Sequence, residues 1–224
     1  MARVCCIFPE VDTFLSGEQR IRVERYEPAG AGPHPALLLA HGSGGAVSYW
    51  LNRFAPQLMP FGVGLHAPYY FDKTGTVRAT AETILDGQHF PAWLRALEDA
   101  VIDLRARPAV DGRRIGVLGI SLGGYLAVAL GIGDPTLRVV IELSGGIPPG
   151  WEDRVTAAMP PTLVLHGAED TMVPVSEAYK LQRVLKERGA RCQTEIFPRE
   201  NHWFSPQAGP KLLMTCGAFL ARYL

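Results

Sequence analysis

The sequence has no long hydrophobic run, since no stretch approaches the roughly 18 consecutive apolar residues that a membrane-spanning helix needs. The apolar run within residues 1–10 is only five residues long, which is too short for the core of a signal peptide. We therefore expect a cytoplasmic protein that does not bind membranes.

An excess of charge of one sign is also missing. Lys and Arg together number 22, as do Asp and Glu, so the formal net charge is zero. Nothing in this balance favours nucleic acid or an anionic membrane as a partner. Zero net charge also does little to oppose self-association, so a homodimer is compatible with the sequence.

Cysteine is scarce, and two chemical motifs are absent. The four cysteines are Cys5, Cys6, Cys192 and Cys216, with no CxxC pair and no zinc-type His/Cys spacing. We expect reduced, structural thiols and no metal site. No GxxxxGK[ST] segment occurs either, which argues against a phosphate-binding loop.

What the sequence does have is an ordinary globular composition, with 47% hydrophobic and 20% charged residues in 224. We expect one domain spanning residues 1–224. Strand-like and helix-like segments alternate, which predicts a mostly parallel, twisted sheet with helices on both faces. Two loop-like tracts, 68–90 and 144–161, are too short to form a large lid domain.

The predicted elements follow from hydrophobic periodicity. The predicted strands are 19–27, 36–40, 62–67, 115–118, 139–143, 163–165 and 194–197. The predicted helices are 91–107, 121–131, 175–188 and 209–223.

The most informative motif is Gly119-x-Ser121-x-Gly123, which lies between a predicted strand and a predicted helix. A turn this tight leaves no room for side chains two residues either side of the serine, so glycine is needed there. The turn strains the serine backbone and presents its hydroxyl to substrate. We predict that Ser121 is a nucleophile, although a glycine-rich turn that only packs would show the same pattern.

A serine hydroxyl needs a base, and the base needs an acid that orients it. In the chain order nucleophile, acid, histidine, Asp170 follows a predicted strand and His202 follows the next one. We therefore predict Asp170 as the acid and His202 as the base. Glu169 is the next candidate acid, and Asp153 is more remote because it precedes its strand.

An acyl-transfer intermediate also needs two N–H donors for its negative oxygen. One would be the backbone N–H of Leu122, the residue after the nucleophile. The other is expected from the glycine-rich loop 41–45, most simply from Ser43. A plain glycine turn is the alternative interpretation of this loop.

Five segments together resemble the dienelactone hydrolase group of α/β hydrolases. They are HGSGG at 41–45, HAPYY at 66–70, GISLGG at 119–124, HGAEDTMVP at 166–174 and NHWF at 201–204. The resemblance covers nearly the whole chain. It implies the α/β-hydrolase fold and a triad of Ser121, His202 and Asp170.

The chain departs from this group at two positions. Dienelactone hydrolases use a cysteine nucleophile, where this chain has Ser121. They also carry a glutamate in the loop after the first buried strand, whereas loop 41–45 has no acid. Both departures make the chain more similar to general carboxylesterases and serine peptidases of the same fold.

Aromatic side chains flank the predicted catalytic loops and could form an apolar pocket, although packing of the loops explains them equally well. They are Tyr49, Trp50, Tyr70, Trp151 and Trp203. No Arg or Lys cluster is visible, so a small to medium, neutral and largely apolar ester fits best.

The sequence thus predicts a serine hydrolase of carboxylic esters that works through an acyl-enzyme, without cofactor or metal. A lactone hydrolase, a peptidase and a thioesterase are alternatives on the same triad. A binding protein that kept the fold without catalysis is the alternative from a different class.

Overall fold

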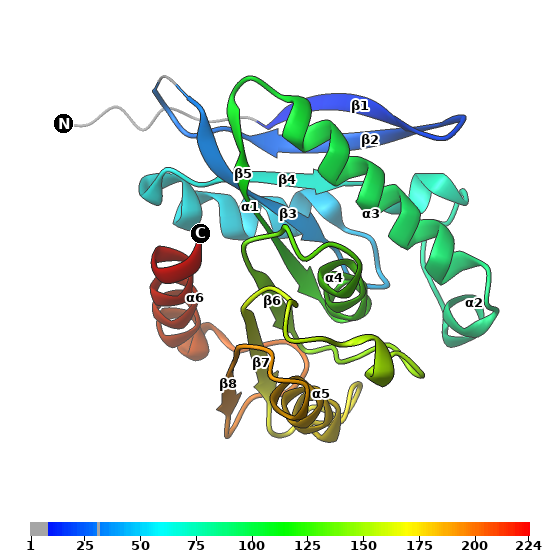
Figure 1. Ribbon diagram of the computed structural model, residues 1–224, viewed down its shortest axis with the longest axis vertical. Helices are drawn as coiled ribbons and strands as arrows, with labels where there is room; N and C mark the ends of the chain where they lie inside the picture. Colours follow the sequence, from blue (N-terminus) through cyan, green and yellow to red (C-terminus); the bar gives the residue numbers. More distant parts are fainter. Residues whose placement is uncertain (1–8, 31) are drawn as a thin grey trace.

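The computed structural model describes residues 9–30 and 32–224. Cys5 and Cys6 lie outside these residues, whereas Cys192 and Cys216 are free thiols. One eight-stranded sheet crosses the molecule in the order β1-β2-β4-β3-β5-β6-β7-β8 (Figure 1). Among the described residues, no helix has both the length and the apolar character required to cross a membrane.

The strands are β1 (Glu10–Ser16), β2 (Gln19–Tyr26), β3 (His34–Ala40), β4 (Gly64–Pro68), β5 (Val110–Ile120), β6 (Val140–Leu143), β7 (Thr162–Gly167) and β8 (Cys192–Phe197). The β1–β2 and β2–β4 pairings are antiparallel, and every pairing from β4 through β3 to β8 is parallel. The predicted mostly parallel sheet is therefore confirmed.

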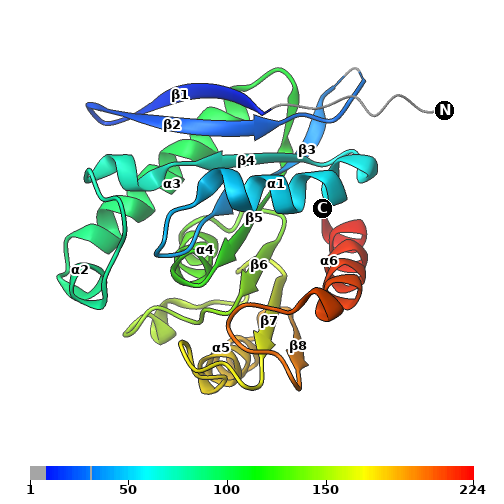
Figure 2. The same cartoon turned by 180° about the vertical axis from the view of Figure 1, so that it is seen from behind.

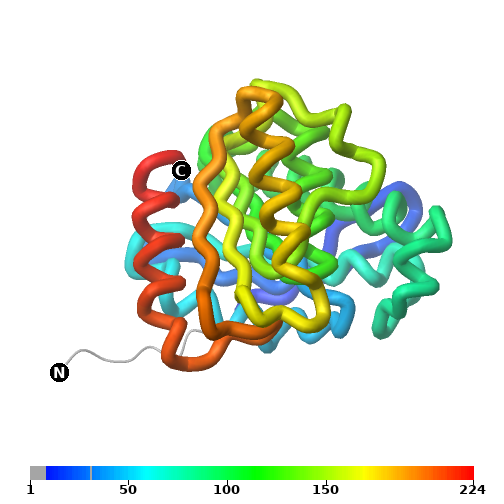
Figure 3. Tube along the Cα trace, turned by 90° about the horizontal axis from the view of Figure 1, so that it is seen from below, coloured from blue at the N-terminus to red at the C-terminus, as the bar shows by residue number. Residues whose placement is uncertain are grey.

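The helices are α1 (Val47–Leu58), α2 (Ala81–Leu85), α3 (His89–Ala106), α4 (Leu122–Gly133), α5 (Ser176–Glu187) and α6 (Gly209–Tyr223). Helices α3, α4 and α5 cover one face of the sheet, and α1 and α6 cover the other (Figure 2). The view from below places α5 and α6 on opposite sides of β7 and β8 (Figure 3). Helices on both faces were predicted, and this is confirmed.

The two faces follow from the alternation of side chains along each buried strand. On β3, Leu38 points into the core under α3, α4 and α5, whereas Leu37 and Leu39 point toward α1 and α6. Because both faces are covered, the central strands read as continuous apolar runs.

Three elements were not predicted, because each lacks the usual sequence signals. Strand β1 buries only Phe14 and Ser16 of its residues. Helix α1 starts after Ala46 in a left-handed conformation with no side-chain cap, and it contains Pro56. Helix α2 has five residues and lies within the tract 68–90, which the sequence suggested was a loop.

The sheet geometry also positions the functional residues. Loop 41–45, Ser121, Asp170 and His202 all follow the carboxyl ends of parallel strands, at one edge of the sheet. This edge is where open α/β sheets bind their ligands.

Helix α3 allows a direct test of this packing. Leu97 is fully buried, whereas Ile102 on the same helix is 60% exposed. We expect Leu97→Ala to lower the free energy of unfolding by about 2–5 kcal/mol, because it removes buried methyl groups and leaves a cavity. Ile102→Ala, the control, should change it by less than about 0.5 kcal/mol. Equal effects in urea unfolding would contradict the assigned faces.

Candidate active site

Ser121 sits in a very tight turn between β5 and α4. Its backbone φ of 56° is in the left-handed region that residues with side chains rarely adopt. A Cβ on Gly119 would overlap the carbonyl oxygen of Gly123, and a Cβ on Gly123 would overlap that of Ala40. The two glycines therefore allow the strand and the helix to meet with backbone touching backbone, and this contact holds the serine in place.

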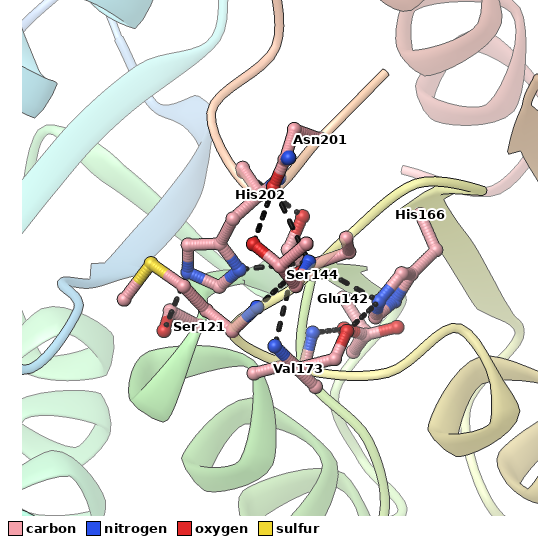
Figure 4. Close-up of polar contacts among 11 residues, drawn as sticks. Ser121, Glu142, Ser144, His166, Val173, Asn201 and His202 are labelled. Carbon is pink, nitrogen blue, oxygen red and sulfur yellow. Dashed lines mark hydrogen bonds and ion pairs between the residues drawn. The ribbon is translucent and has the colours of Figure 1, made fainter. Parts of the chain in front are cut away.

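Ser121, His202 and Asp170 form one hydrogen-bonded relay, and Figure 4 shows the imidazole of His202 pointing toward Ser121. Nε2 of His202 lies 3.0 Å from Oγ of Ser121, and Nδ1 lies 2.8 Å from Oδ2 of Asp170. The three residues are 7%, 4% and 8% exposed, respectively. An imidazole held in this way can take the serine proton while the carboxylate stabilises the positive charge that forms.

The carboxylate of Asp170 is itself held by neighbouring donors. Its Oδ1 accepts hydrogen bonds from the backbone N–H groups of Met172 and Val173, both at 2.8 Å. His166 places Nε2 3.3 Å from Oδ2 and 2.9 Å from the carbonyl oxygen of Val173. Because a carbonyl can only accept, the proton of His166 is on Nε2. Burial lowers the pKa of His166, which favours its neutral form.

Two positioning contacts were missed by the sequence reasoning. Asn201 Oδ1 accepts from the backbone N–H of His202 at 2.7 Å and from that of Thr171 at 3.3 Å. The hydroxyl of Ser144 donates to the carbonyl oxygen of His202 at 3.4 Å. Asn201 thus links the loop of the acid to the loop of the base. Its place beside His202 was the only signal in the sequence.

The loop 41–45 lies directly against the nucleophile. A Cβ on Gly42 would be 3.4 Å from Cβ of Ser121, and Ser43 lines the adjoining pocket. Leu122 is the first residue of α4, so its N–H has no partner within the helix. Both backbone groups remain our predicted oxyanion donors.

A pocket of about 380 Å³ opens beside His202. Tyr49, Trp50 and Trp203 line it, and the rings of Trp50 and Trp203 stack with centroids 5.6 Å apart. The ring of Trp203 meets the imidazole of His202 edge to face at 4.6 Å. This wall gives the mouth of the pocket an apolar side.

Residues 21–212 match the sequence profile of the dienelactone hydrolase family. The chain belongs to the dienelactone hydrolase family. It is a hydrolase by that membership, and the fold expected from the resemblance is confirmed.

The same fold is seen in solved structures. The dienelactone hydrolase-like promiscuous phosphotriesterase P91 from metagenomic libraries superposes with a TM-score of 0.82 at 18% identity, covering 96% of this chain and 98% of that one. The acetyl ester-xyloside bifunctional hydrolase from Caldicellulosiruptor lactoaceticus gives 0.77 at 18% identity, covering 97% and 98%.

Curated relatives match over shorter stretches. The dipeptidyl-peptidase 5 of Aspergillus fumigatus is 40% identical over 55 residues, which is 25% of this chain and 8% of that protein. The chain therefore spans only a small part of that relative's length.

Two predicted pocket residues lie elsewhere in this family member. Tyr70 is fully buried, stacks on the ring of His41 at 4.0 Å and donates its hydroxyl to the His41 carbonyl. Trp151 is half-buried and lies 4.2 Å under the guanidinium of Arg154. Neither side chain is part of the pocket lining described above, because Tyr70 packs on His41 and Trp151 packs against Arg154 in the loops that follow β4 and β6.

Two other buried histidines, His41 and His66, do not compete for the role of base. Burial lowers the pKa of His41 to about 4 and that of His66 to about 3. Both are therefore neutral at pH 7, so the 3.5 Å approach of His66 Nε2 to Oε1 of Glu27 is not an ion pair at that pH. Across residues 9–30 and 32–224, no group of three or more His, Cys, Asp or Glu side chains is arranged to hold a metal ion.

Two arginines line the pocket, although the sequence suggested no basic cluster. Arg53 comes from α1, and Arg78 comes from the segment before α2. Within the described residues, neither guanidinium has an ion-pair partner within 4.0 Å. The two arginines are 25 residues apart in the sequence, and only the fold brings both to one pocket. The sequence pattern therefore gave no sign of a shared basic site.

The relay predicts a specific effect of Asp170→Asn. The amide cannot hold the imidazole in the required tautomer, so labelling of Ser121 by a fluorophosphonate probe should slow by about 10³- to 10⁴-fold. The exposed neighbouring acid provides the control, and Glu169→Gln should label at the wild-type rate. Similar labelling rates for the two variants would refute Asp170 as the acid.

Proposed function

We propose that this chain is a serine hydrolase that cleaves carboxylic esters through an acyl-enzyme. The observation that carries the proposal is the relay from Asp170 through His202 to Ser121, beside a pocket with an aromatic wall. Such a relay converts a weakly nucleophilic hydroxyl into an effective one at neutral pH.

In the first half of the reaction, Oγ of Ser121 attacks the ester carbonyl while Nε2 of His202 takes its proton. The carbonyl oxygen becomes negative and is held by the N–H groups of Leu122 and Ser43. The intermediate collapses, the bond to the leaving oxygen breaks, and His202 protonates the departing alcohol.

In the second half, water repeats the attack on the acyl-enzyme. His202 takes a proton from the water, the bond between the acyl carbon and Oγ of Ser121 breaks, and the serine recovers its proton. The products are one alcohol and one carboxylic acid. Every proton transfer in this scheme uses side chains of the chain itself.

General esters are favoured over dienelactones by the chemistry of the nucleophile. The family's cysteine is replaced by Ser121, and loop 41–45 lacks the acid that accompanies that cysteine. An acetyl ester is named for the Caldicellulosiruptor lactoaceticus hydrolase of this fold. A peptidase is the second candidate, because a stretch of 55 residues is 40% identical to a dipeptidyl-peptidase.

Ser121→Ala tests the proposal. Hydrolysis of p-nitrophenyl acetate and butyrate should fall by about 10⁴-fold or more, since the residual rate comes only from binding and the oxyanion donors. Cys216→Ser, a change remote from the relay, is the control and should retain activity. A panel with a lactone, a thioester and a dipeptide amide then ranks the substrate classes.

Two outcomes would contradict the proposal. Equal ester hydrolysis by wild type and Ser121→Ala would remove Ser121 from the mechanism. Failure of the wild type to react with a fluorophosphonate probe would favour a binding protein of this fold over an enzyme.

The two arginines refine the expected substrate to one with an apolar body and an anionic outer end. Wild type should prefer 4-nitrophenyl hydrogen adipate to 4-nitrophenyl hexanoate, which has the same chain length without the charge. In the double variant Arg53→Gln/Arg78→Gln, kcat/KM for the adipate should fall about tenfold, whereas the hexanoate value should hardly change. The preference should also weaken in high salt, because both guanidinium groups are exposed. An unchanged adipate rate would restore the neutral-ester prediction.

A further inference from the structure

A buried acid lies under the nucleophile without a role in the relay. Glu142 is on β6 and is fully buried. Its Oε1 accepts a hydrogen bond from the backbone N–H of Gly145. Its Oε2 is also buried and has no hydrogen-bond partner within the part of the chain that the structure describes. Buried acids are seldom tolerated without a reason, because their desolvation is costly.

The residues 142–145, which we call the 142–145 turn, contact both the nucleophile and the base (Figure 4). The carbonyl oxygen of Leu143 accepts the backbone N–H of Ser121 at 2.8 Å. The hydroxyl of Ser144 donates to the carbonyl oxygen of His202 at 3.4 Å. The shape of this turn therefore bears on the distance between Ser121 and His202.

The turn has an unusual backbone that needs support. Ser144 is fully buried with a φ of 54°, a conformation that costs energy for a residue with a side chain. The bond from Gly145 to the Glu142 carboxyl closes the turn across this strained residue.

Two glycines make room for the carboxyl against α4. A Cβ on Gly124 would be 3.2 Å from Oε1 of Glu142, and a Cβ on Gly145 would be 2.8 Å from the carbonyl oxygen of Ser121. The carboxyl thus packs against the first turn of α4, immediately behind the nucleophile.

We propose that Glu142 is a positioning residue that acts as an uncharged carboxylic acid. It holds the 142–145 turn so that Ser121 and His202 stay within hydrogen-bond distance of each other. The inference rests on the proposed function, since it assumes that Ser121 is the nucleophile. In this role the side chain of Glu142 must accept the hydrogen bond from Gly145 and must carry no charge.

The uncharged state agrees with the surroundings of the carboxyl. The pKa of Glu142 is raised to about 8, mainly by burial; the hydrogen bond from Gly145 opposes this rise, and the negative charge of Asp170 adds to it. At pH 7 the carboxyl is therefore mostly protonated.

Other titratable groups lie near Glu142, and the pKa of each has its own causes. Burial is the main cause that raises the pKa of both Tyr125 on α4 and Cys192 on β8. The negative charge of Glu177 on α5 adds to the rise in the pKa of Tyr125. The positive charge of Lys186 on the same helix opposes the rise in the pKa of Cys192. Asp170, in the loop after β7, also acts on Glu142 through its negative charge, and it lies 3.3 Å from Nε2 of His166.

Ionisation of Glu142 should oppose catalysis. It would put a negative charge beside the N-terminus of α4, where the reaction also develops a negative charge on the substrate oxygen. Two like charges in a site of low polarity repel each other, and a loss of about tenfold in rate is expected once Glu142 is ionised. Activity should therefore decline through an alkaline limb near pH 8.

The test measures the rate at which a fluorophosphonate probe labels Ser121 between pH 5.5 and 9.5. Wild type should show the alkaline limb. Glu142→Gln keeps an acceptor for Gly145 but cannot ionise, so it should label within about threefold of wild type at pH 7 and lose the limb. Glu142→Leu removes the acceptor and should label about tenfold more slowly at every pH.

Two controls separate this effect from other groups. Glu177→Gln removes a nearby charge of the same type, and Cys192→Ser removes the nearby thiol. Both should keep the alkaline limb of wild type.

Thermal unfolding gives a second measurement. The unfolded carboxyl ionises above its ordinary pKa of 4.5, whereas the folded one stays protonated until about pH 8. Wild type therefore loses stability from this group as pH rises between these values. The Tm of Glu142→Gln minus that of wild type should increase from pH 5 to pH 8.

The outcomes are distinguishable. A wild-type rate that stays flat to pH 9.5, an alkaline limb that persists in Glu142→Gln, or full activity in Glu142→Leu would each overturn the inference while leaving the proposed function intact. Absence of any labelling of wild type would overturn the proposed function, and this inference with it.

Discussion

The site depends on a contact between backbones at the end of β5. Gly119, Gly123 and Ala40 meet there without an intervening side chain, so β5, α4 and the end of β3 approach more closely than any other residues would allow. This contact forces Ser121 into its strained conformation and brings loop 41–45 beside it. The strain is tolerated because the surrounding sheet and helix are rigid and well packed.

The parallel sheet extends this local constraint to the rest of the site. Strands β5, β6, β7 and β8 end at the same edge, so loops that are distant in sequence converge there. Side chains then fix the loops to each other, with Asn201 joining the acid loop to His202 and Ser144 joining β6 to His202. Burial also sets the charge states, since the pKa of His41 is lowered to about 4 while that of Glu142 is raised to about 8.

Much of this arrangement could be predicted from local patterns. The glycine spacing around Ser121 and the strand endings before Asp170 and His202 indicate a triad in sequence order, because a tight turn and a parallel sheet impose local rules. Apolar runs located the central strands because strands buried on both faces need them. Helix α1 was not predicted, because its start has no side-chain cap and its last turn contains Pro56, a residue that usually ends a helix.

The sequence by itself determined the fold class, the order of the central strands and of the four longer predicted helices, and the residue types available for acyl transfer. These depend on short-range sterics and on hydrophobic periodicity, which can be recognised from residues that are close together in the sequence. Only the tertiary structure decided which side chains share a space. It buried Tyr70 against His41, placed Arg53 and Arg78 at one pocket, and set Glu142 behind the nucleophile. Distances and burial are properties of packed neighbours, and residues far apart in sequence become neighbours only on folding.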